Sequence, residues 1–150
     1  MMSKLPMVGV LILTHGRMAE ELLSAARTIT GSMESFEALA LDWEDDFATA
    51  QAKVEPALER LDRGAGVLIL TDIYGGTPSN VAMGFVEPGR VEMLSGVNLP
   101  MVVRLGCLRA ADMSLGDLTD WIRRKGRDAI CVGSSSPRVT VTAATIDPCD

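Results

Sequence analysis

The sequence is poor in the residues that most often bind metal ions or form disulfides. It has one histidine, His15, and three cysteines without a CxxC spacing among its 150 residues. A structural zinc site needs about four such ligands at close spacing, so we expect no bound metal. The cysteines are Cys107, Cys131 and Cys149. An odd number of scattered cysteines indicates reduced thiols, which are typical of a cytoplasmic protein.

Long apolar runs and an excess of positive charge are also missing. No apolar run approaches the roughly 20 residues that cross a bilayer, and residues 1–6 lack the apolar core of a signal peptide. Lysine and arginine number 14 against 20 aspartates and glutamates, which gives a net charge of −6. This balance argues against binding to nucleic acid or to an anionic membrane, because both require clustered cations. The one basic cluster, at residues 123–127, is interpreted as the end of a helix.

The standard motifs for binding nucleotide phosphates are absent as well. The sequence contains neither GxxxxGK[ST] nor GxGxxG. Any phosphate chemistry would therefore have to use a different arrangement of residues.

The nine methionines of the chain are interpreted as core filler, since methionine packs into irregular apolar gaps.

What the sequence does contain is an alternation of short apolar segments with amphipathic stretches. Strands are predicted at 7–13, 36–41, 66–71 and 91–94, and helices at about 17–30, 47–61, 77–85, 101–109 and 114–124. This order predicts an α/β fold with a doubly wound, mainly parallel open sheet and helices on both faces. A C-terminal edge strand is predicted at 129–132 or 139–142. We expect a single domain over residues 1–150, with a core at about 7–132 and a tail at 133–150.

Local signals predict the buried faces and the ends of these helices. The first helix is predicted to bury a stripe of apolar residues at helical spacing, namely Met18, Leu22, Ala25, Ala26 and Ile29. The remaining signals are Asp45 or Asp46 as a helix cap, Pro56 as a kink or interruption, Thr77 and Ser114 as further caps, and Gly126 as a helix end.

Polar residues follow the first and third predicted strands at the point where each strand ends. The first strand ends in Thr14-His15, and the third ends in Thr71-Asp72. In common doubly wound sheets these strands are neighbours, so His15 and Asp72 should meet at the carboxyl edge. A carboxylate that holds one ring N–H fixes the tautomer and leaves the other nitrogen free to act as a nucleophile. Because residues 75–77 enter a helix N-terminus beside this pair, the arrangement suits phosphoryl transfer to nitrogen.

Each of these residues also has an interpretation without chemistry. A histidine after a strand is often a cap or turn residue, and Asp72 could form an Asx turn. The two glycines, Gly75 and Gly76, could serve only a tight turn. Spacing and composition alone therefore predict an α/β domain with a His/Asp site and leave its chemistry open.

Three motifs together give the chain a family resemblance. They are Val10-Leu-Ile-Leu-Thr-His-Gly, Leu70-Thr-Asp-Ile-Tyr-Gly-Gly-Thr-Pro-Ser-Asn and Ser95-Gly-Val-Asn-Leu-Pro-Met. In this order, over about residues 7–132, the chain resembles the IIA domain of the mannose-type sugar phosphotransferase system, the mannose/fructose/sorbose family. Many members have a serine where this chain has Thr77, which keeps the hydroxyl.

The resemblance implies a role for each residue of the site. His15 would be phosphorylated on Nε2, and Asp72 would orient it. The residues expected around the phosphoryl group are Thr14, Gly75, Gly76, Thr77 and Ser79. The residues expected to form the wall of the cleft are Gly16, Val97, Asn98 and Pro100. No cofactor and no metal is implied.

The resemblance also implies partners. The protein would accept a phosphoryl group from the small carrier protein HPr and pass it to a IIB domain, which phosphorylates sugar as a membrane permease takes it up. Similar members form homodimers that exchange a C-terminal strand. The absence of an Ala/Pro-rich linker indicates a stand-alone IIA protein. The alternatives are a regulatory relay protein, a phosphotransfer subunit for dihydroxyacetone kinase and, least favoured, a flavodoxin-like protein that binds flavin or a nucleotide.

Overall fold

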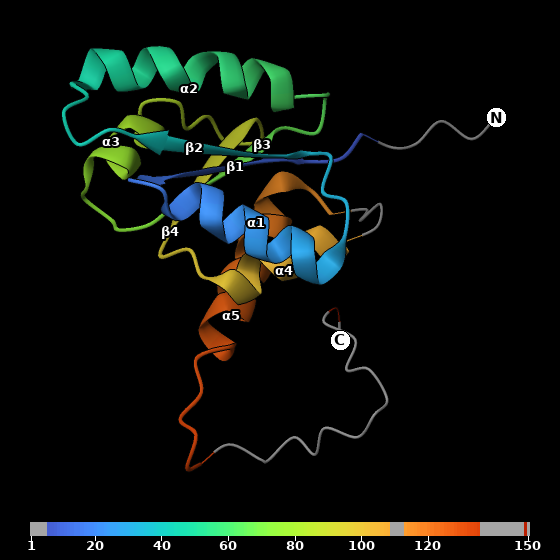
Figure 1. Cartoon of the computed structure of the whole chain (residues 1–150). Helices are drawn as coiled ribbons and strands as arrows, with labels where there is room; N and C mark the ends of the chain where they lie inside the picture. Colours follow the sequence, from blue (N-terminus) through green and yellow to red (C-terminus); the bar gives the residue numbers. More distant parts are fainter. Residues whose placement is uncertain (1–5, 109–112, 136–148, 150) are drawn as a thin grey trace.

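The computed structural model describes residues 6–108, 113–135 and 149, and it places one parallel sheet at the centre of the molecule (Figure 1). The strands are β1 (Gly9–His15), β2 (Phe36–Leu41), β3 (Val67–Thr71) and β4 (Val91–Ser95). Their order in the sheet is β2-β1-β3-β4, and all three neighbouring pairs are parallel. The predicted α/β fold with a mainly parallel sheet is confirmed, and β1 and β3 are neighbours as expected.

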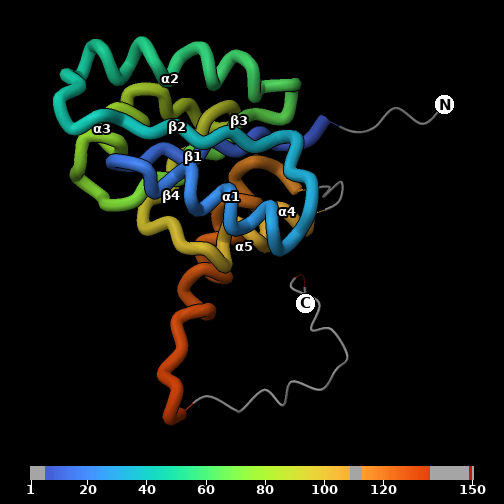
Figure 2. Tube along the Cα trace, viewed as in Figure 1, coloured from blue at the N-terminus to red at the C-terminus, as the bar shows by residue number. Residues whose placement is uncertain are grey.

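Five helices cover the two faces of the sheet among the described residues. They are α1 (Met18–Thr30), α2 (Phe47–Leu61), α3 (Thr77–Met83), α4 (Leu99–Cys107) and α5 (Leu115–Asp128). Figures 1 and 2 show α2 and α3 on one face and α1, α4 and α5 on the other. None of the helices in the described ranges is long and apolar enough to cross a membrane.

Strand β1 is buried on both sides because both layers of helices pack against it. Val10 and Ile12 join the core cluster under α1, α4 and α5, whereas Leu11 and Leu13 join the cluster under α2 and α3. All four are at most 2% exposed. A central strand that is apolar on both faces gives its last residue, His15, a fixed backbone position.

Three helix predictions were wrong in detail. Helix α1 buries Ala19, Leu23 and Ala26, whereas Met18 and Ile29 of the predicted stripe are 49% and 44% exposed. Ala26 belongs to both the predicted and the observed sets, and Ala19 packs in the core cluster in the first turn of the helix. The other two differences are that α2 is not interrupted at Pro56 and that Gly126 lies inside α5.

The reasons differ for these two residues. Pro56 faces solvent, so water can solvate the carbonyl group that its missing N–H leaves unpaired. Gly126 marks a close helix crossing, because a Cβ there would lie 2.6 Å from Cγ of Met101 in α4. The cap predictions were nearly right: Asp46 and Ser114 cap α2 and α5, and α3 begins at Thr77 with Gly76 as its cap.

The C-terminal segment differs from two expectations. Residues 129–132 form no strand after α5, so that prediction was wrong, and the alternative at 139–142 lies outside the described residues. Cys107, the last residue of α4, forms a disulfide with Cys149, so the expectation of reduced thiols was wrong for this pair. Cys131 is free and exposed.

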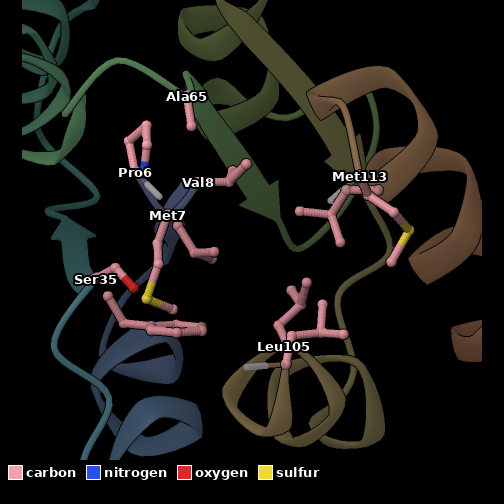
Figure 3. Close-up of a pocket in the computed structure, with 11 residues that line it drawn as sticks. Pro6, Met7, Val8, Ser35, Ala65, Leu105 and Met113 are labelled. Atoms are coloured by element: carbon pink, nitrogen blue, oxygen red, sulfur yellow. The ribbon is translucent and has the colours of Figure 1, made fainter. Parts of the chain in front are cut away.

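A small apolar cavity of about 60 Å³ lies at the amino end of the sheet. Figure 3 shows Pro6, Met7 and Val8 at its rim, with Leu105 and Met113 opposite them. These residues precede β1 or belong to the α4–α5 region, so the cavity lies at the opposite end of β1 from His15. It therefore does not contribute to the site that the sequence predicts.

Candidate functional site

The site is built at the carboxyl ends of β1 and β3. The two strands are parallel neighbours, with Leu13 opposite Thr71. His15 and Asp72 therefore follow at the same edge of the sheet, next to each other. Oδ2 of Asp72 accepts hydrogen bonds from the backbone N–H of His15 (2.9 Å) and pairs with its ring Nδ1 (2.8 Å). The structure thus brings together the two side chains that the strand ends predicted.

Asp72 is held as a carboxylate. Burial alone would raise its pKa, but hydrogen bonds from the backbone and ring of His15 and from the backbone N–H of Ile73 (2.8 Å to Oδ1) outweigh it. The pKa of Asp72 is therefore below the usual value for an aspartate. An ionised Asp72 can only accept a hydrogen bond, so Nδ1 carries the ring proton and Nε2 presents its lone pair. This tautomer is assigned from the hydrogen bonds.

The loop between β3 and α3 closes on the edge of the imidazole ring. Gly75 has a φ of +88°, which favours glycine, and a Cβ on Gly76 would lie only 2.8 Å from Cε1 of His15. Oγ of Ser79 accepts a hydrogen bond from the N–H of Gly75 (2.8 Å) and donates one to the carbonyl of Gly76 (3.2 Å). The loop is thereby fixed beside His15, and the exposed Thr77 begins α3 at its end.

Two residues expected around a phosphoryl group are buried in structural roles. Thr14 is 0% exposed, and its Oγ1 accepts a hydrogen bond from the backbone N–H of Ala19 (2.8 Å), which ties the start of α1 to β1. Ser79 is 1% exposed and holds the glycine loop. Both hydroxyls have partners within the protein, and their contact with a phosphoryl group stays a prediction.

The residues expected to form the cleft wall lie in two places, two of them directly beside the ends of β1 and β3 and two at the start of α4. Gly16 turns the chain directly after His15 with a φ of +55°, and the N–H of Val97 bonds to the carbonyl of Thr71 (3.0 Å) at the base of the site. Asn98 instead caps α4 and donates its Nδ2 to the carbonyl of Gly126 (3.1 Å). Pro100 is exposed in the first turn of α4. Asn98 and Pro100 therefore lie at the start of α4, and their place in the cleft wall stays a prediction.

Sequence reasoning missed Trp43. Its indole ring stacks on the imidazole of His15, with the ring centroids 5.0 Å apart and the planes at 17°. The signal was the strand order, because Leu41 at the end of β2 pairs with His15 and Trp43 follows two residues later. A loop that leaves a neighbouring strand at the same edge reaches the same site.

Within the described residues, no group of three or more His, Cys, Asp or Glu side chains is placed to hold a metal ion. The imidazole of His15 is held at Nδ1 by a carboxylate and faces Gly76 at Cε1. Its Nε2 is a nitrogen nucleophile, which can form and release a bond to phosphorus.

Comparison with known proteins connects this site to a family. A family model described as "PTS system fructose IIA component" matches residues 9–122. The chain is 31% identical over 138 residues to the fructose-specific EIIA component of Bacillus subtilis, covering 91% of this chain and 94% of that protein. It is also 31% identical over 131 residues, or 87% of this chain, to the mannose-specific EIIAB component of Escherichia coli K12. The chain spans 41% of the length of that relative.

A solved structure is similar over nearly the whole chain. The mannose/sorbose-specific IIA subunit from Enterococcus faecalis superimposes with a TM-score of 0.75 and 27% identity, covering 89% of this chain and 98% of that one.

Proposed function

The chain belongs to the mannose/fructose IIA family of the sugar phosphotransferase system, and on this basis we propose that it is a phosphocarrier that takes a phosphoryl group on His15 and passes it on. The observation that carries the proposal is the pair of His15 and Asp72, with Nδ1 held at 2.8 Å and Nε2 left to react. The reaction is a transfer between two nitrogen atoms, so the protein acts as a phosphotransferase.

In the accepting step, the lone pair of Nε2 attacks the phosphorus of a phosphohistidine on the donor. The new N–P bond forms as the donor's N–P bond breaks, and that electron pair returns to the donor ring. His15 gains positive charge as it accepts the group, and the ionised Asp72 stabilises that charge through Nδ1–H. In the donating step the same events run in reverse toward the next nucleophile.

The glycine loop supports the phosphoryl group in this proposal. Gly76 lies against the ring edge next to Nε2, and Thr77 places a hydroxyl at the exposed start of α3. Because glycine leaves the backbone accessible, Gly75 and Gly76 allow the group to approach main-chain N–H donors. Thr14 and Ser79 keep β1 and the loop in position.

The proposed partners follow from membership of this family. We propose an HPr-like phosphocarrier as donor and a IIB domain as acceptor, for sugar uptake and phosphorylation through a permease. We further propose that the chain forms one domain, works in the cytoplasm and needs no cofactor.

Labelling tests the proposal directly. With phosphoenolpyruvate and the general enzymes of the phosphotransferase system, the protein is expected to gain one phosphoryl group that is labile in acid and stable in alkali. His15 is the only histidine, so this stability profile together with loss of the label in His15→Ala assigns the group, and ³¹P–¹⁵N NMR distinguishes Nε2 from Nδ1. No incorporation, or an acid-stable phosphate on another residue, would refute the proposal.

We also propose a homodimer. Among the described residues no strand pairs with the outer edge of β4, and Ile130 and Val132, just after α5, are 79% and 65% exposed. Apolar side chains and an open strand edge are both stabilised by a second copy. Light scattering is expected to give twice the chain mass of 16.0 kDa, and a monomer at micromolar concentration would contradict the dimer.

A further inference from the structure

The indole ring of Trp43 covers one face of the His15 imidazole. We propose that Trp43 is a positioning residue that holds the ring in the orientation from which Nε2 accepts and donates the phosphoryl group. This inference rests on the proposed phosphocarrier function and adds a residue to its machinery. It starts from the stacked geometry, with centroids 5.0 Å apart and planes at 17°.

The other contacts of the ring restrain it only at its edges. Asp72 holds Nδ1 in the plane of the ring, and Gly76 limits movement at Cε1. Neither contact opposes a tilt of the ring out of its plane. Trp43 supplies that missing restraint, because a parallel aromatic ring resists tilting over its whole area.

Core packing does not explain the position of Trp43. The residue is 80% exposed, so most of its apolar surface remains in water, where a large aromatic side chain gains little. The stacking on His15 is the ring contact that this side chain makes in the described structure. An exposed indole aligned with the only histidine of the chain therefore indicates a role at the site.

The turn that carries Trp43 is fixed by its own polar contacts. Nζ of Lys53 lies 2.6 Å from Oδ2 of Asp45 and 3.5 Å from Oδ2 of Asp42. Oδ2 of Asp45 also accepts a hydrogen bond from the backbone N–H of Asp42 (3.0 Å), and Asp46 caps α2. These contacts hold the backbone on both sides of Trp43 without using the indole. Replacing the indole should therefore leave the turn in place.

The consequence for transfer is geometric and electrostatic. Reaction requires Nε2 to point along the line to the phosphorus, and small errors in this direction slow transfer strongly. The imidazole also gains positive charge while the group is arriving, and the face of an indole attracts a cation. Both effects act on the rate of the chemical step and not on docking of the donor.

The test compares Trp43→Ala with Trp43→Phe, using Phe47→Ala as a matched control. Phe47 is a second exposed aromatic residue near this edge, 51% exposed, in the first turn of α2. Trp43→Ala is expected to lower kcat for transfer from the phosphorylated donor by about tenfold, with KM unchanged within about twofold. Trp43→Phe should restore most of the rate, and Phe47→Ala should keep the wild-type kcat.

A spectroscopic readout separates positioning from general damage. The His15 Cε1–H signal in NMR should be shifted by the ring current of the indole in the wild type, and it should lose this shift in Trp43→Ala. In a Trp121→Phe background, the fluorescence of Trp43 should change when His15 is phosphorylated. Thermal unfolding of Trp43→Ala is expected to match that of the wild type, as the exposure of the side chain implies.

Each result supports or overturns the inference. If Trp43→Ala transfers as fast as the wild type, or if only KM rises while kcat is kept, Trp43 does not position the ring. A wild-type ring signal without an indole shift would also overturn the inference. If the wild type takes no phosphoryl group at all, the proposed function fails and the inference fails with it. If the wild type is phosphorylated and Trp43→Ala transfers at the same rate, only the inference fails.

Discussion

Asp72→Asn is expected to slow phosphorylation of His15 on the order of 10²- to 10³-fold while leaving the fold intact. Oδ2 of Asp72 serves both the backbone N–H and the ring Nδ1 of His15, and Oδ1 accepts from the N–H of Ile73. The amide of asparagine has only one acceptor oxygen. Its NH₂ group must therefore face either the His15 donors or the N–H of Ile73, and that hydrogen bond is lost. The imidazole also loses the negative charge that stabilises it during transfer.

The measurement is a rapid-quench time course with phosphorylated donor, read together with thermal unfolding. Asp117→Asn is the matched control, because it removes the same charge from the exposed first turn of α5. The control should transfer at the wild-type rate. A rate for Asp72→Asn within about threefold of wild type would mean that the contact with Nδ1 does not contribute to transfer.

Because the pKa of Asp72 is lowered, the difference in unfolding free energy between the wild type and Asp72→Asn should depend on pH. Stabilisation from a carboxylate whose pKa is lowered on folding is fully present above its unfolded value of about 3.9 and is lost as the pH falls through the folded value. The difference in stability between the wild type and Asp72→Asn should therefore be constant near neutral pH and shrink below about pH 4. Denaturant unfolding at several pH values measures it.

The sequence was sufficient to bring His15 and Asp72 together because strand periodicity and parallel pairing are simple constraints. The apolar segments ending at His15 and Thr71 had to be central strands, and central neighbours bring their ends together. Trp43 was not found because an exposed aromatic in an acidic turn has no periodicity of its own. Its position follows only from the observed pairing of Leu41 with His15.

The hydrogen-bond partners of the site residues could not be predicted, for one physical reason. Residue type predicts that a hydroxyl or amide will form a hydrogen bond, but the partner depends on packing. The bonds of Thr14, Ser79 and Asn98 that hold α1, the glycine loop and α4 were therefore not predicted from the sequence. The disulfide between Cys107 and Cys149 has the same character, because 42 residues separate the partners and no local pattern connects them.

Gly76→Ala is expected to reduce phosphoryl transfer by about tenfold to a hundredfold without unfolding the protein. The backbone of Gly76, at φ −77° and ψ 170°, is extended, so alanine fits its conformation. The added Cβ would however lie 2.8 Å from Cε1 and 3.4 Å from Nε2 of His15, and 3.1 Å from Cγ2 of Ile73. The imidazole must move, and any movement lengthens its contact with Asp72 or breaks its stacking on Trp43.

Gly116→Ala is the control for this change, because the same substitution in α5 meets no atom within 4 Å. Both variants should unfold at temperatures close to that of the wild type, but only Gly76→Ala should transfer slowly and show an altered Nδ1 proton signal. Normal transfer by Gly76→Ala would show that the ring can move aside and still react. The methyl group also approaches Nε2, so a larger residue such as valine at position 76 should lower the transfer rate further. A rate that falls with the size of the side chain indicates crowding of the ring and not a general change in the loop.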